Sequence, residues 1–100
     1  MGNSQPVLGY RRDLPNGDII QVVVWLLPEP LPGSLHCYKY RLHYQNADGS
    51  DYIRLDNVRG KGDHRHIGGI EAPYQFESVK KLAQDFYAAI KQARTTGGIK

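Results

Sequence analysis

The most constraining feature of the sequence is the run CYKYRLHYQNADGSDYIRLDN, at residues 37–57. Its apolar and polar residues alternate on both sides of an Asp48–Gly49 pair, a pattern typical of two half-buried strands joined by a tight turn. A two-residue turn at Asp48–Gly49 gives one register that matches apolar with apolar and polar with polar residues. The opposed pairs are Tyr44 with Ile53, Leu42 with Leu55, His43 with Arg54, and Arg41 with Asp56. This agreement predicts an antiparallel hairpin with one basic face.

A predicted turn and a predicted strand precede a stiff, proline-rich connection. The Asn16–Gly17 pair predicts a hairpin turn, and the segment IIQVVVWLLP that follows is dense in β-branched residues, which favours a long central strand. Val22, Val24 and Leu26 would share one face of it. The segment PEPLPGS at residues 28–34 holds three prolines, so it cannot lie inside a strand or a helix.

The period changes after Ser78. Apolar residues then recur at helical spacing, at Val79, Leu82, Ala83, Phe86, Ile90 and Ala93. Ser78 is a plausible N-cap, and Gly97–Gly98 marks the expected end. The pattern predicts one amphipathic helix from about Ser78 to Ala93.

These elements predict a single α+β domain spanning residues 1–100, with a flexible tail from about residue 95. Its antiparallel sheet would have four to five strands, and the C-terminal helix would cover the apolar face. The helix is expected to bury its apolar stripe against Tyr44, Ile53 and Leu55. Four aromatic residues are interpreted first as core: Trp25, Tyr38, Tyr40 and Phe86.

The composition indicates the class of partner and the cellular compartment. Thirteen Lys and Arg against ten Asp and Glu give a net charge of +3, a weak preference for acidic partners such as nucleic acid. Cys37 is the only cysteine, which excludes an intrachain disulfide and favours a reducing compartment. No apolar run reaches the length of a membrane span. We therefore predict a cytoplasmic protein with no membrane partner.

The stretch DNVRGKGDHRHIGG, at residues 56–69, concentrates groups that can hold phosphate or move protons. One hypothesis is a metal site, with His64 and His66 joined by Asp56, Asp63 or His43. The cations Arg59, Lys61 and Arg65 argue against it, because they would repel a bound cation, and we predict no metal and no cofactor. The composition is also that of an ordinary solvated connection between a strand and a helix.

A second hypothesis is that the same residues cleave RNA by acid–base catalysis without a metal. Such cleavage needs a base for the 2′-hydroxyl, an acid for the leaving oxygen, and positive charge for the transition state. Imidazoles suit the first two roles because they titrate near neutrality. The predicted catalytic residues are His64 and His66 as acid and base in either order, Lys61 and Arg65 as cations, and Asp56 or Asp63 to orient an imidazole. The predicted substrate-binding residues are Arg41, His43, Arg54, Arg59 and Asn57.

Three segments also resemble the TumE family of small bacterial toxins: VVWLLPEPLPGSLHCYKYRLHY, RLDNVRGKGDHRHIG and PYQFESVKKLAQDF. The family pattern has a Trp-x-Leu-Pro-x-Pro segment, then Lys-Tyr-Arg-Leu, then Asp-Asn-x-x-Gly-Lys-Gly-Asp-His-x-His. All three occur here in order, over roughly residues 18 to 90. The last is the specific one, because it includes Asp56, Asn57, Gly60, Lys61, Gly62, Asp63, His64 and His66.

The resemblance implies a cytoplasmic toxin encoded beside a cognate antitoxin, typically a helix-turn-helix DNA-binding protein. It supplies no catalytic residues. The expected function is therefore a toxin acting on RNA or the ribosome as a metal-independent endoribonuclease. The alternative is a non-catalytic inhibitory or nucleic-acid-binding module that uses the same basic surface. The sequence leaves a homodimer open.

Overall fold

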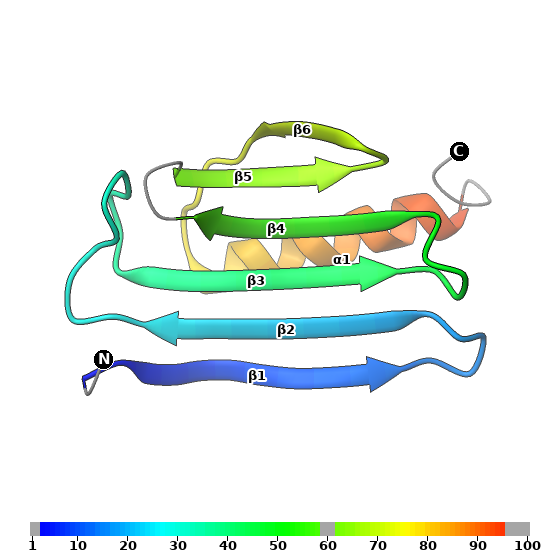
Figure 1. The fold of residues 1–100 in the computed structure, drawn as a ribbon, viewed down its shortest axis with the longest axis horizontal. Coiled ribbons are helices and arrows are strands. Elements are labelled where there is room, and N and C mark those ends of the chain that lie inside the picture. The colour runs from blue at the N-terminus through cyan, green and yellow to red at the C-terminus, as the bar shows by residue number, and fades with distance from the viewer. Residues whose placement is uncertain (1–2, 59–61, 96–100) are drawn as a thin grey trace.

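The computed structural model describes residues 3–58 and 62–95, which form one antiparallel sheet and one helix (Figure 1). The strands follow one another across the sheet in chain order, so every neighbouring pair is a hairpin. They are β1 (Gln5–Asp13), β2 (Ile19–Leu26), β3 (Tyr38–Gln45), β4 (Tyr52–Val58), β5 (Gly62–Ile67) and β6 (Ile70–Pro73). The helix α1 (Val79–Thr95) lies against one face. The α+β class is confirmed.

The central hairpin has the predicted register. Residues of β3 and β4 pair as Arg41 with Asp56, Leu42 with Leu55, His43 with Arg54 and Tyr44 with Ile53. The connection is longer than the predicted two-residue turn, because the Asn46 N–H still donates to the Asp51 carbonyl and the Gly49 N–H donates to the Asn46 carbonyl. The first hairpin turns at residues 14–18, where the Gly17 N–H donates to the Leu14 carbonyl, as the Asn-Gly pair predicted.

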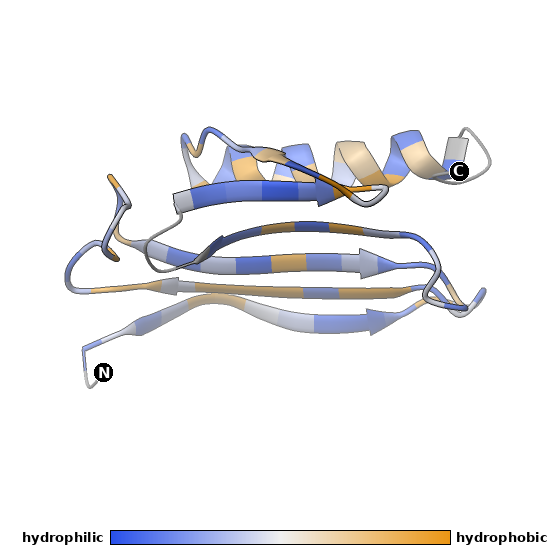
Figure 2. Ribbon diagram, turned by 45° about the horizontal axis from the view of Figure 1, so that its top comes forward, coloured by the Kyte–Doolittle hydropathy of each residue, from blue (hydrophilic) through white to orange (hydrophobic). Residues whose placement is uncertain are grey.

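The strand count is six rather than four to five, because the stretch predicted as a connection forms β5 and β6. These strands are joined at Gly68–Gly69, where φ is +58° and +82°. A two-residue hairpin turn with both central residues at positive φ favours glycine at both positions. The strand β5 has too few apolar residues to show the alternation typical of a half-buried strand. Figure 2 shows that β5 is hydrophilic over most of its length.

The core lies between α1 and the facing side of the sheet. Alternate residues of β2, β3 and β4 point into it, and the helix contributes its predicted stripe. The buried apolar residues are Ile20, Val22, Val24, Tyr40, Leu42, Tyr44, Ile53, Leu55, Leu82, Phe86, Ile90 and Ala93. Trp25 is not among them: it lies on the opposite face and is 39% exposed, which corrects the core interpretation.

The helix begins where predicted. The Ser78 hydroxyl accepts a hydrogen bond from the Lys81 N–H at 3.0 Å, which satisfies one of the free donors of the first turn. The expected Gly97–Gly98 stop and most of the expected flexible tail lie outside the described residues. Within the described ranges, no helix is both long and apolar enough to cross a membrane.

Candidate active site

The sheet face opposite α1, here called the open face, gathers most of the predicted site residues. Side chains alternate between faces along each strand, and strand pairing aligns those that share a face. In β4 and β5, Asp56 pairs with His64 and Arg54 pairs with His66. The polar members on β3 to β6 are Lys39, Arg41, His43, Gln45, Tyr52, Arg54, Asp56, His64, His66 and Glu71.

His64 is the most enclosed of these side chains, with 7% of its surface exposed. Its Nδ1 lies 3.2 Å from the Gly62 carbonyl oxygen. A carbonyl only accepts, so this contact assigns a proton to Nδ1. The other ring nitrogen, Nε2, lies 2.9 Å from Asp56 Oδ1. Both ring nitrogens thus lie against protein oxygens, which fixes the orientation of the ring.

Asp56 Oδ1 has an unusual environment. It is buried and accepts no hydrogen bond from any described residue, although His64 Nε2 is so close. The Nε2 atom is close, but it does not meet the oxygen in a hydrogen-bonding direction, so the short contact does not satisfy Asp56 Oδ1. A buried carboxylate oxygen without a donor is destabilising, because an unsatisfied buried acceptor costs about 1–3 kcal/mol. A bound metal ion would satisfy it.

His66 and Glu71 complete the cluster from β5 and β6. One carboxylate oxygen of Glu71 lies 3.7 Å from His64 Nε2 and 3.8 Å from His66 Nε2. The two imidazole rings meet edge to face, with centroids 5.1 Å apart. His66 is the more accessible of the two rings, at 20% side-chain exposure against 9% for His64. A ligand on the open face therefore meets His66 first.

Basic and aromatic side chains adjoin the cluster on β3 and β4. The Arg54 guanidinium carbon lies 5.5 Å from the centre of the Tyr52 ring, and its Nε lies 3.5 Å from His43 Nδ1. Burial lowers the pKa of His43, and the charges of Arg54 and Arg41 lower it further, against the opposing effect of a hydrogen bond with Gln45. His43 is thus kept neutral beside two fixed positive charges.

Arg65 is separated from the two histidines that flank it in sequence. It pairs with Leu55, on the face that α1 covers, and lines a small cleft with Tyr74, Lys81 and Asp85. It therefore does not share a face with His64, contrary to the expected grouping. The other two predicted cations of this stretch, Arg59 and Lys61, lie outside the described residues.

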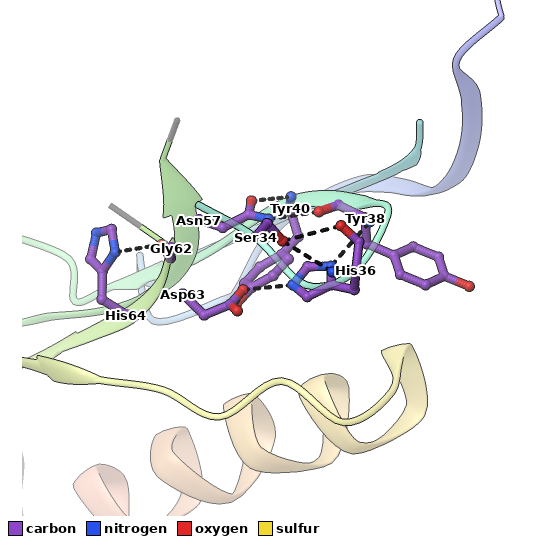
Figure 3. A network of polar contacts seen from close by, with 8 residues as sticks. All are labelled: Ser34, His36, Tyr38, Tyr40, Asn57, Gly62, Asp63 and His64. Carbon is purple, nitrogen blue, oxygen red and sulfur yellow. Dashed lines mark hydrogen bonds and ion pairs between the residues drawn. The ribbon is translucent and has the colours of Figure 1, made fainter. Parts of the chain in front are cut away.

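Asp63 and Asn57 also project to the helix side, where their contacts are with the fold itself (Figure 3). Asp63 Oδ1 accepts hydrogen bonds from the Tyr40 hydroxyl at 2.6 Å and from His36 Nε2 at 2.9 Å. Asn57 is 2% exposed; its amide donates to the Tyr38 carbonyl and accepts from the Tyr40 N–H. Its side chain thus continues the β3–β4 ladder beyond the last paired residues.

The family model described as Toxin TumE matches residues 3–94. The chain belongs to the TumE toxin family. Searches of the curated proteins and of the solved structures found no match. The TumE match spans all six strands, including every described residue of the open face.

Two residues of interest in this TumE chain were missed by sequence reasoning. Glu71 could have been found had Gly68–Gly69 been treated as a two-residue turn, because that turn sets Glu71 opposite His66. His36 was given no role, yet it stacks on Phe76 with ring centroids 4.0 Å apart, and its Nε2 donates a hydrogen bond to Asp63. No local pattern indicates that contact, because the partners are 27 residues apart.

Proposed function

We propose that this TumE family toxin cleaves RNA as a metal-independent endoribonuclease and that the open face is its active surface. The observation that carries the proposal is the pair of adjoining imidazoles on the open face, the buried His64 beside Asp56 and the more accessible His66. General acid–base cleavage of RNA needs two such groups beside positive charge.

The chemistry follows from the residues of that face. One imidazole removes the proton of a ribose 2′-hydroxyl, and the resulting oxygen attacks the adjacent phosphorus. The P–O5′ bond breaks, and the other imidazole donates a proton to the departing 5′-oxygen. The products are a 2′,3′-cyclic phosphate and a 5′-hydroxyl. Arg54 and Arg41 take the transition-state role that the sequence had given to Lys61 and Arg65, since both lie on the face of the histidines.

The partner follows from the family. A toxin that acts inside its own host needs a neutraliser, and membership of a toxin family implies a cognate antitoxin. We expect a small helix-turn-helix protein encoded beside this one, whose carboxylates would complement Arg41 and Arg54 across the open face. Co-expression should restore growth, and the two proteins should co-purify. An Arg41→Glu, Arg54→Glu double variant should lose that complex.

The decisive experiment incubates end-labelled RNA with the purified protein in EDTA and identifies the new termini. The proposal expects cleavage with cyclic phosphate ends, and a loss of about 10²–10⁴-fold in rate for His66→Ala and for His64→Ala. His36→Gln is the matched control, because it alters a histidine on the other face. Intact RNA, or full activity in both open-face variants at equal folded yield, would overturn the proposal.

A second function is favoured by one observation. Trp25 is 39% exposed on the open face and pairs with Lys39, so an aromatic platform lies beside a row of cations. Such a surface binds single-stranded nucleic acid by stacking and phosphate contacts without any chemistry. Tight, salt-sensitive RNA binding that Trp25→Ala weakens, with the RNA left intact, would select this non-catalytic alternative.

A further inference from the structure

We infer that the open face also holds a binding site for one divalent transition-metal ion of the zinc class. Its ligands are Asp56, His64 and His66, with Glu71 as the fourth donor. The binding step is independent of the proposed ribonuclease activity. Only its consequence, which is inhibition of cleavage, rests on that activity.

The ligand atoms converge from three strands. One donor atom from each of Asp56, His64 and His66 lies within 4.8 Å of the other two. Bonds of 2.0 to 2.2 Å in a tetrahedral zinc site place neighbouring ligand atoms roughly 3.3 Å apart. The widest pair must therefore close by about 1.5 Å, a movement within reach of rotation about side-chain bonds. His66 and Glu71 are the most exposed members and are free to make it.

The independent observation is the unsatisfied oxygen of Asp56. It is buried without a hydrogen bond among the described residues, and it lies 2.9 Å from His64 Nε2. The Nδ1–H of His64 donates to a backbone carbonyl, the contact that typically fixes the tautomer of a metal-bound histidine. Ligand and orienting contact are thus both in place before any ion arrives.

Charge and access also fit. Asp56 and Glu71 provide two negative charges, which offset the neighbouring Arg41 and Arg54, and Arg65, which had argued against a metal, lies on the opposite face of the sheet. His64 and Glu71 line an open cleft of about 460 Å³ with Asp63, Ala72 and Pro73, so two of the four ligand residues border space open to solvent. Two imidazoles favour zinc, cobalt or nickel over magnesium and calcium, which prefer oxygen ligands alone.

Occupancy would remove the acid–base pair. A metal ion takes the same Nε2 lone pairs that the proposed mechanism uses to accept protons, so a bound ion and proton transfer exclude one another. We therefore expect zinc to inhibit cleavage and a chelator to restore it.

Calorimetric titration of the metal-stripped protein with Zn²⁺ tests the site directly. One equivalent should bind, with affinity at least about tenfold weaker in Asp56→Asn and in His66→Gln. His36→Gln is the control and should bind like the parent. Mg²⁺ should give no heat of binding at the same concentration.

Three results would overturn the inference: no saturable Zn²⁺ binding, equal binding in both ligand variants, or weakened binding in His36→Gln alone. His66 is more exposed than His64, so its substitution disturbs the packing of the sheet less. A protein that binds zinc at these residues but leaves RNA intact keeps the metal site and loses the ribonuclease. A protein that cleaves RNA but does not bind zinc keeps the ribonuclease and loses the metal site.

Discussion

Asp63 and His64 are consecutive in the chain, yet their side chains engage opposite faces of the sheet. Asp63 accepts hydrogen bonds from His36 and Tyr40 on the helix side, whereas His64 Nε2 lies 2.9 Å from Asp56 on the open side. Figure 3 shows the two side chains leaving β5 in different directions. The alternation of a strand therefore divides the conspicuous polar stretch into a structural half and a chemical half.

The structural half predicts a stability effect at Asp63. Burial and the hydrogen bond to Asp63 raise the pKa of Tyr40, so its hydroxyl remains a neutral donor that needs an acceptor. Asp63→Ala strands that donor and should lower the free energy of unfolding by about 1–3 kcal/mol. Urea denaturation measures the loss. In a Tyr40→Phe background the same change should cost less, and strictly additive losses would contradict the contact.

The two hairpin turns at one end of the sheet predict unequal costs for the same substitution. Gly17 and Gly49 both have positive φ, at +95° and +76°. A Cβ at Gly17 would lie 2.8 Å from the Ala47 Cβ, whereas one at Gly49 would meet nothing closer than 3.8 Å. Gly49→Ala should cost about 1–2 kcal/mol from backbone strain alone. Gly17→Ala should cost on the order of 1 kcal/mol more, because it adds a steric clash. Equal thermal shifts would refute the difference.

His43 predicts how stability depends on pH. Burial, then Arg54 and Arg41, hold its pKa below the ordinary 6.5 in the folded protein. As pH falls below about 6.5, the unfolded chain takes up a proton that the folded chain resists, so the free energy of unfolding decreases. The decrease stops below the folded pKa. Urea denaturation at several pH values between 7.5 and about 5 gives the free energy of unfolding as a function of pH. This free energy should fall less steeply with decreasing pH in His43→Gln than in the parent. An unchanged slope would contradict the assignment.

Sequence reasoning succeeded where alternation was strong. Leu42, Tyr44, Ile53 and Leu55 fixed both the faces and the register of the central hairpin, because a one-residue slip would expose all of them. It failed for β5, where the residues before Ile67 are all polar or glycine and offer no apolar period. Because that segment was taken for a loop, the alternation of side chains between the two faces of a strand was not applied to it. Arg65 was therefore grouped with His64 and His66, although it lies on the other face.

The candidate site was predicted in part. Asp56, His64 and His66 come together as a group, since residues of like parity on adjacent strands share a face. Asn57 was assigned to substrate although its parity matches Ile53 and Leu55, which already indicated the core side. Contacts between distant segments, such as His36 with Asp63, depend on how the proline-rich connection returns to the sheet. No periodicity encodes that path.

Arg54 and Arg65 provide the sharpest test of the division between faces. Both are arginines on neighbouring strands, but Arg54 pairs with His66 on the open face and Arg65 pairs with Leu55 on the helix side. If RNA lies across the open face, Arg54→Gln should weaken binding and reduce the slope of log K against log salt by about 0.7, the value of one phosphate contact on a single strand. Arg65→Gln, with the same change in net charge, should leave that slope unchanged. Filter binding at several salt concentrations measures both. A larger effect from Arg65 would place the RNA on the helix side and remove the open face from the function.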